Sequence, residues 1–152
     1  MMAAQEPTIH ASAVLVGAKA ALIRGPSGSG KSRLAWDILG AAAQGALPFA
    51  RLVADDRAHA ENQSGRLLVR PAKELAGLIE VHGLGIRRVD FEPVAAVGLV
   101  VDLAAGDAAR HPEPAATTAQ IAGITLPRLA VAAGMAALPV VLARLRTLPA
   151  GD

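Results

Sequence analysis

Short runs of apolar residues, separated by turn-forming residues, predict a series of β-strands along the chain. Residues 12–16 and 20–23 are mostly apolar, and the turn at residues 17–19 between them is typical of a hairpin. Residues 94–103 are almost continuously apolar, with Asp102 near the end, as in a strand buried on both faces. Further short runs predict strands at residues 51–54, 67–69, 79–81 and 124–126.

Two stretches carry apolar residues at helical spacing. In residues 33–39 the apolar positions recur three and four residues apart, and either Gly40 or Gly45 can end the helix. Residues 140–148 predict a final helix, with Pro139 near its first turn, where proline is well tolerated. This mixture of a hairpin, a strand-to-helix unit and later strands predicts an α/β fold with a mixed central sheet.

The remaining residues and the composition fit a single domain over residues 1–152. Residues 104–119 are rich in alanine, proline and polar residues and predict a loop, and residues 73–78 predict a short helix or a turn. The chain is 53% hydrophobic but only 2% aromatic, so its core must be aliphatic. We therefore expect Trp36 and Phe91 to be packing residues.

Charge and cysteine content narrow the classes of partner. The formal net charge is only +2, the arginines are scattered, and aromatic residues that stack on bases are scarce, which disfavours nucleic acid. The chain has no cysteine, so it can form no disulfide or thiolate metal site, and a cytoplasmic location fits best. The first residues lack a signal-peptide pattern. The longest uncharged run, residues 129–143, is shorter than the roughly 20 residues of a membrane span.

The main chemical motif lies between the strand at residues 20–23 and the helix that follows it. Residues 25–32 fit G-x-x-x-x-G-K-[ST], in which backbone N–H groups cradle phosphates, the lysine reaches the β- and γ-phosphates, and the last hydroxyl binds magnesium. An ordinary glycine-rich turn would have no use for the Lys-Ser pair. The residues expected to hold a nucleotide are Gly25, Pro26, Ser27, Gly28, Ser29, Gly30, Lys31, Ser32 and Arg33.

Three further segments have the order and spacing of a known family. They are His10 ahead of the first strand, the Ala54-Asp55-Asp56 sequence after the third, and residues 80–86, which read Glu-Val-His-Gly-Leu-Gly-Ile. With the phosphate loop they resemble the catalytic domain of bacterial HPr kinase/phosphorylase. The resemblance implies a P-loop fold akin to phosphoenolpyruvate carboxykinase. It also implies ATP-dependent phosphorylation of a serine on the phosphocarrier protein HPr, often with phosphate-driven removal of the same group.

The resemblance also implies roles for individual residues. The aspartate pair would supply the base that takes the seryl proton, with His10 nearby to hold or polarise it. Adjacent side chains on a strand point to opposite faces, so one of Asp55 and Asp56 would face the phosphate, and which one is the base stays open. Glu80 would be a second Mg²⁺ contact beside Ser32, since this hard cation prefers oxygen ligands.

Lys31 and Arg110 complete the implied catalytic set, because Arg110 falls about where the family has an arginine that steadies the transferring phosphoryl group. The chain resembles a short form without the N-terminal domain of longer members. His82 stands in place of an arginine and Pro26 in place of an acidic residue. A Pro-x-x-Pro-Gly-Arg-Asn segment associated with dephosphorylation is reduced to residues 126–129. Kinase activity is therefore expected, and phosphorylase activity is left open.

Two other functions fit the motif. A small-metabolite P-loop kinase would need an arginine-rich lid, which only Arg87, Arg88 or Arg110 could supply. A regulatory module would bind a nucleotide and a signalling partner without turnover, and His82 and the shortened segment favour this alternative. Because the family commonly forms hexamers, the resemblance also predicts a homo-oligomer.

Overall fold

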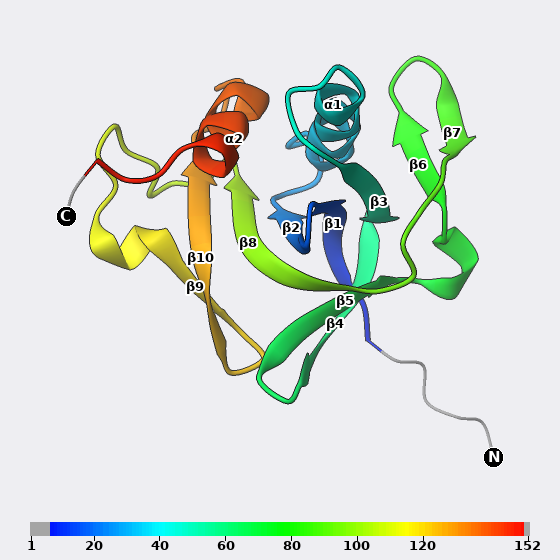
Figure 1. Ribbon diagram of the computed structural model, residues 1–152, viewed down its shortest axis with the longest axis horizontal. Helices are drawn as coiled ribbons and strands as arrows, with labels where there is room; N and C mark the ends of the chain where they lie inside the picture. Colours follow the sequence, from blue (N-terminus) through cyan, green and yellow to red (C-terminus); the bar gives the residue numbers. More distant parts are fainter. Residues whose placement is uncertain (1–6, 151–152) are drawn as a thin grey trace.

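The computed structural model describes residues 7–150, so the first six residues, considered above for a signal peptide, lie outside the described part. Figure 1 shows two helices side by side over one side of the strands, with a small hairpin beyond the first helix. The strands are β1 (Ile9–Val16), β2 (Lys19–Arg24), β3 (Ala50–Ala54), β4 (Arg57–Gln63), β5 (Arg66–Pro71), β6 (Leu78–Val81), β7 (Gly85–Arg88), β8 (Ala95–Leu103), β9 (Thr118–Ile121) and β10 (Ile124–Val131). The helices are α1 (Lys31–Ala43) and α2 (Ala137–Arg146), with short 3₁₀ turns η1 (Lys73–Leu75) and η2 (Pro114–Thr117).

Five of the strands form a closed ring. β2 pairs with β1, β1 with β4, β4 with β5, β5 with β8, and β8 returns to β2. β8 runs parallel to β2 and β10, whereas the other strand pairs of the described chain are antiparallel. The predicted mixed α/β sheet is therefore confirmed. β3 pairs with β1, and β6 pairs with β7 in a separate two-stranded sheet.

Two hydrophobic clusters hold these elements together. One lies between the helices and the sheet and includes Leu34 and Ile38 of α1 and Val141 of α2. The other draws mainly on strands of the ring and contains many alanines, such as Ala11 and Ala13, which are fully buried. Small side chains suit this position because a ring of five strands encloses little space. The expected aliphatic core is therefore present, in two parts.

The aromatic residues depart from the expectation that they pack in the core. The buried face of α1 is formed by Leu34, Ala35, Ile38 and Ala41. Trp36 lies off this face and is 43% exposed, so its interpretation as a packing residue is wrong. Phe91 is also partly exposed, although its ring packs where a side chain on Gly77 would otherwise lie.

The boundaries of the helices also differ from those predicted. α1 begins at Lys31, continues through Gly40 and ends before Gly45, whose φ of 86° suits a helix stop. α2 begins at Ala137, three residues before the predicted start, and this places Pro139 in its first turn as expected.

Three strands were not predicted at all. β4, β7 and β9 are short or polar and lack an apolar run, and β9 begins inside the region expected to be a loop. Their formation depends on pairing with β5, β6 and β10, which a local pattern does not show.

Candidate active site

The turn between β2 and α1 has the geometry of a phosphate-binding loop. Gly28 and Gly30 have φ values of 81° and 99°, in the region that only glycine adopts freely. A Cβ atom on Gly25 would lie 2.5 Å from Ser29 Oγ and 3.1 Å from the carbonyl oxygen of Leu103. The glycines of the motif are therefore needed both for the path of the loop and for its contact with the end of β8.

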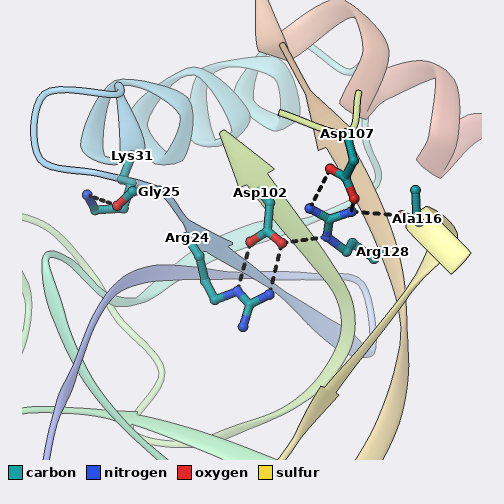
Figure 2. A network of polar contacts seen from close by, with 7 residues as sticks. All are labelled: Arg24, Gly25, Lys31, Asp102, Asp107, Ala116 and Arg128. Atoms are coloured by element: carbon teal, nitrogen blue, oxygen red, sulfur yellow. Dashed lines mark hydrogen bonds and ion pairs between the residues drawn. The ribbon is translucent and has the colours of Figure 1, made fainter. Parts of the chain in front are cut away.

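The groups of this loop fit an anion. Gly30 caps α1 without a side-chain hydrogen bond, and the first turn contains no acidic residue, so the helix N–H groups remain available. Ser29 Oγ is buried and has no hydrogen-bond partner in the described residues. Lys31 is buried, and its Nζ donates to the carbonyl oxygen of Gly25 at 2.9 Å (Figure 2). It also donates to the carbonyl oxygen of Pro26 at 3.1 Å. A phosphate group would supply partners for all of these donors.

Asp55 links this loop to three strands. Its side chain is buried, and Oδ1 accepts hydrogen bonds from Ser32 Oγ at 2.7 Å and Ser12 Oγ at 2.8 Å. Oδ2 accepts a hydrogen bond from the backbone N–H of Glu80 at 3.1 Å. The carboxylate that follows β3 therefore contacts the last residue of the phosphate motif, and it also contacts β1 and β6.

Asp56 is directed differently from Asp55. Both residues lie beyond the end of β3, and Asp56 has a φ of 67°, a left-handed conformation that aspartate tolerates better than most residues. Its side chain is exposed, and its backbone N–H donates to Ser12 Oγ at 3.2 Å. Asp55 is thus buried and Asp56 exposed, and because both residues follow the end of β3, the alternation of side chains along a strand does not apply to this pair.

The other predicted site residues lie at different places. His10 is inside β1, not ahead of it, and its side chain is exposed. Strand alternation places His10 on the same face of β1 as Ser12, the partner of Asp55. Glu80 is in β6 with an exposed side chain, and only its backbone N–H contacts Asp55. Arg110 is exposed in the segment that follows β8 and makes no hydrogen bond or ion pair with another described residue.

A cavity of about 540 Å³ adjoins the phosphate loop. Its lining is formed by residues 26–30 of the loop, by Arg33, Leu34 and Asp37 of α1, and by residues 103–104 and 131–139. Most of these residues are apolar, and the volume is within the range of small-molecule sites. Arg33 is directed into solvent and forms a weak ion pair with Asp37 at 3.4 Å. The space is suited to the base and sugar of a nucleotide whose phosphates lie in the loop.

A second polar network, shown in Figure 2, was not found by the sequence analysis. Arg24, directly before the loop, donates two 2.8 Å hydrogen bonds to the two oxygens of Asp102 in β8. Arg128 in β10 donates to Asp102 at 2.5 Å and to the two oxygens of Asp107 at 2.8 and 3.0 Å. A charged residue inside an apolar strand needs a partner, so the position of Asp102 in the sequence already indicated a buried ion pair.

The two arginines also set the acidity of this network. Burial raises the pKa of Asp102, but the hydrogen bonds from Arg24 and Arg128 outweigh it and leave the pKa below the ordinary 3.8. The hydrogen bonds from Arg128 likewise lower the pKa of the exposed Asp107. Both carboxylates are therefore charged at neutral pH and neutralise the two guanidinium groups.

Comparison with solved structures finds the Hpr(Ser) kinase/phosphatase from Coxiella burnetii, with a TM-score of 0.72. The match covers 92% of this chain and 88% of the other, at 21% sequence identity. The chain has the fold of that enzyme. The resemblance inferred from the motifs is thus confirmed as a similarity of fold. No protein-family model and no curated protein sequence matches the chain.

Two negative findings apply to residues 7–150. None of the helices there is long and apolar enough to cross a membrane. The same residues contain no cluster of three or more histidine, cysteine, aspartate or glutamate side chains arranged to hold a metal ion. Magnesium needs no such cluster, because one or two protein oxygens and the phosphates of a nucleotide are its usual ligands.

Proposed function

We propose that the chain is an ATP-dependent protein-serine kinase that phosphorylates an HPr-type phosphocarrier protein in the cytoplasm. The observation that carries this proposal is the 2.7 Å hydrogen bond between Ser32 Oγ and Asp55 Oδ1. It places a carboxylate next to the last residue of the phosphate loop, where the terminal phosphate of ATP would lie. The similarity of fold to an HPr(Ser) kinase/phosphatase supports the same reaction class.

The chain would bind ATP through the loop and Lys31. The loop amides and the first turn of α1 face the phosphates, and the base and sugar occupy the adjacent cavity. Lys31 would exchange the carbonyl oxygens of Gly25 and Pro26 for phosphate oxygens. Ser32 and Glu80 would hold Mg²⁺, which supplies positive charge to the terminal phosphates when bound.

Asp55 is the better candidate for the base. A carboxylate has about four lone-pair positions. Within residues 7–150, Asp55 Oδ2 accepts only the Glu80 amide, so one position on Oδ2 remains for the seryl proton. As this proton moves to Asp55, the seryl oxygen bonds to the γ-phosphorus, the bond to the bridging oxygen breaks, and ADP leaves. His10 would orient the serine, and Arg110 would contact the transferring phosphoryl group.

The decisive experiment is transfer from γ-labelled ATP, with Mg²⁺, to a purified HPr-type protein, followed by mass spectrometry of the product. Wild-type protein should yield phosphoserine, and Lys31→Ala should abolish it. Nucleotide binding without transfer would favour the regulatory module instead, and transfer to a small molecule would favour the metabolite kinase. Adding inorganic phosphate to the phosphorylated product tests whether the reverse reaction is present. Sedimentation of the same preparation tests the predicted homo-oligomer.

A further inference from the structure

The segment that carries Arg110, residues 104–117, is fastened near its two ends. It leaves β8 at the rim of the cavity, where Leu103 and Ala104 are lining residues, and the backbone N–H of Ala105 donates to Val131 of β10 at 2.9 Å. Towards its other end, η2 leads into β9. The hydrogen bonds that residues 106–117 make with their own segment are short-range, so the position of Arg110 also depends on contacts from outside the segment.

A single side chain from β10, Arg128, contacts the segment on both sides of Arg110. Its Nη1 and Nη2 donate to the two oxygens of Asp107, near the start of the segment, and Nη1 also donates to the carbonyl oxygen of Ala116, near the end, at 2.9 Å. Its Nε donates to Asp102 of β8. The side chain is only 13% exposed, so water competes weakly for these bonds. One guanidinium group therefore closes the segment into a loop and fixes the loop to the sheet.

The same network reaches the phosphate loop. Asp102 accepts hydrogen bonds from Arg128 and, through both oxygens, from Arg24, the residue directly before Gly25. The strand register is consistent with this contact, because Arg24 of β2 and Asp102 of β8 are backbone partners in the sheet. Arg128 thus sets the Arg110 segment relative to the strand from which the phosphate loop begins.

We propose that Arg128 is a positioning residue for phosphoryl transfer, which holds in place the Arg110 segment that begins at the rim of the cavity. The inference rests on the proposed kinase function. Arg128 itself touches no substrate and acts through Arg110. Lysine cannot replace it, because one ammonium group cannot bond the two oxygens of Asp107, Asp102 and Ala116 in these directions.

The first test compares Arg128→Lys with the wild-type protein. A small displacement of a group that contacts the transition state costs rate rather than binding, so kcat should fall roughly 10- to 100-fold. The dissociation constant of ATP, measured by calorimetry, should stay unchanged because the phosphate loop is intact. Arg146→Lys, on an exposed arginine of α2, is the matched control and should leave kcat at the wild-type value. An unchanged kcat in Arg128→Lys would overturn the inference.

A double-mutant cycle with Arg110→Ala separates positioning from a general loss of stability. If Arg128 acts through Arg110, the double variant should be no slower than Arg110→Ala alone. Losses that multiply would show that Arg128 acts by another route and would overturn the inference. If Arg128→Lys folds poorly, Asp107→Asn is the second variant, because this aspartate is 53% exposed and its loss leaves the Asp102 pairs intact.

Amide hydrogen exchange gives a readout that does not need activity. Arg128→Lys should exchange faster in residues 105–117 and remain unchanged in α1, and equal exchange throughout would overturn the inference. A wild-type protein that shows no transfer at all would instead contradict the proposed function. The two failures are therefore distinguishable.

Discussion

Asp55 and Asp102 are both largely buried carboxylates near the carboxyl ends of strands beside the phosphate loop, yet their partners differ in charge. Asp102 is bonded by two guanidinium groups, which cancel its charge and lower its pKa. Asp55 accepts hydrogen bonds from two hydroxyl groups and one backbone amide, and none of these three partners is a cation. The negative charge of a carboxylate with neutral partners is not cancelled by them, whereas that of a carboxylate between two guanidinium groups is already neutralised. This difference supports the proposed catalytic role of Asp55 and indicates a structural role for Asp102.

The sharpest way to break this comparison is Asp55→Asn. The amide has almost the same shape but cannot accept the seryl proton, so kcat should fall about 10²- to 10⁴-fold, the usual contribution of a general base. ATP binding should change little, because the phosphate cradle is made by other residues. Steady-state kinetics and calorimetry measure the two quantities. Equal loss of nucleotide binding would contradict the assigned role.

Asp102→Asn should lower stability more than activity, the opposite of Asp55→Asn. It leaves Arg24 and Arg128 without their shared partner, so the free energy of unfolding should fall by about 2 to 4 kcal/mol, towards the lower end for broken ion pairs because the network is partly exposed. Urea denaturation measures this loss. The fraction of Asp102→Asn that remains folded should have a higher kcat than Asp55→Asn. A lower kcat would mean that Asp102 has the catalytic role and Asp55 the structural one.

The pH dependence of stability sharpens the same contrast. Because the pKa of Asp102 is lower in the folded protein than its ordinary value of 3.8, its stabilising effect is complete well above that pH. The effect is lost as the pH falls through the lowered pKa, since both states then bind the proton. Melting temperatures of wild type and Asp102→Asn should therefore differ most near neutral pH and converge below about pH 3.8. A constant difference across this range would contradict the ion-pair explanation.

Asp56→Asn should have the smallest effect. Asparagine tolerates the left-handed backbone of this position, the side chain is exposed, and the backbone N–H bond to Ser12 is retained. We expect stability within about 0.5 kcal/mol of wild type, as for most surface substitutions. The kinetic assay used for Asp55→Asn checks the activity. A loss of kcat equal to that of Asp55→Asn would move the base from Asp55 to Asp56.

The sequence predicted those features that depend on local patterns. The strand, phosphate loop and helix around Lys31 follow from a contiguous motif, and β8 follows from its apolar run. The polar β4 and the closure of the ring could not be predicted, because they depend on pairing between distant residues. Trp36 shows the limit of composition, because its large apolar side chain suggested packing, whereas its position off the apolar face of the helix leaves it exposed.

In the candidate site, too, the sequence predicted the residues of local motifs but not the contacts between distant residues. The motifs indicated Ser32, Asp55 and Glu80, but the direction of each aspartate depends on the bend after β3. Arg128 was noted only as part of a shortened segment, because its partners lie 12 to 26 residues away along the chain. Long-range polar contacts of this kind become visible only when the strands are placed side by side.

The closed ring has a consequence for how tightly a nucleotide is held. β2 is hydrogen-bonded along both sides, by β1 and by β8, and its final residue, Arg24, is paired with Asp102 by backbone register and by side chain. The stem of the phosphate loop therefore loses its conformational freedom when the protein folds, before the proposed nucleotide binds. Binding then costs less conformational entropy, so the hydrogen bonds between the loop amides and the phosphates contribute more to the affinity.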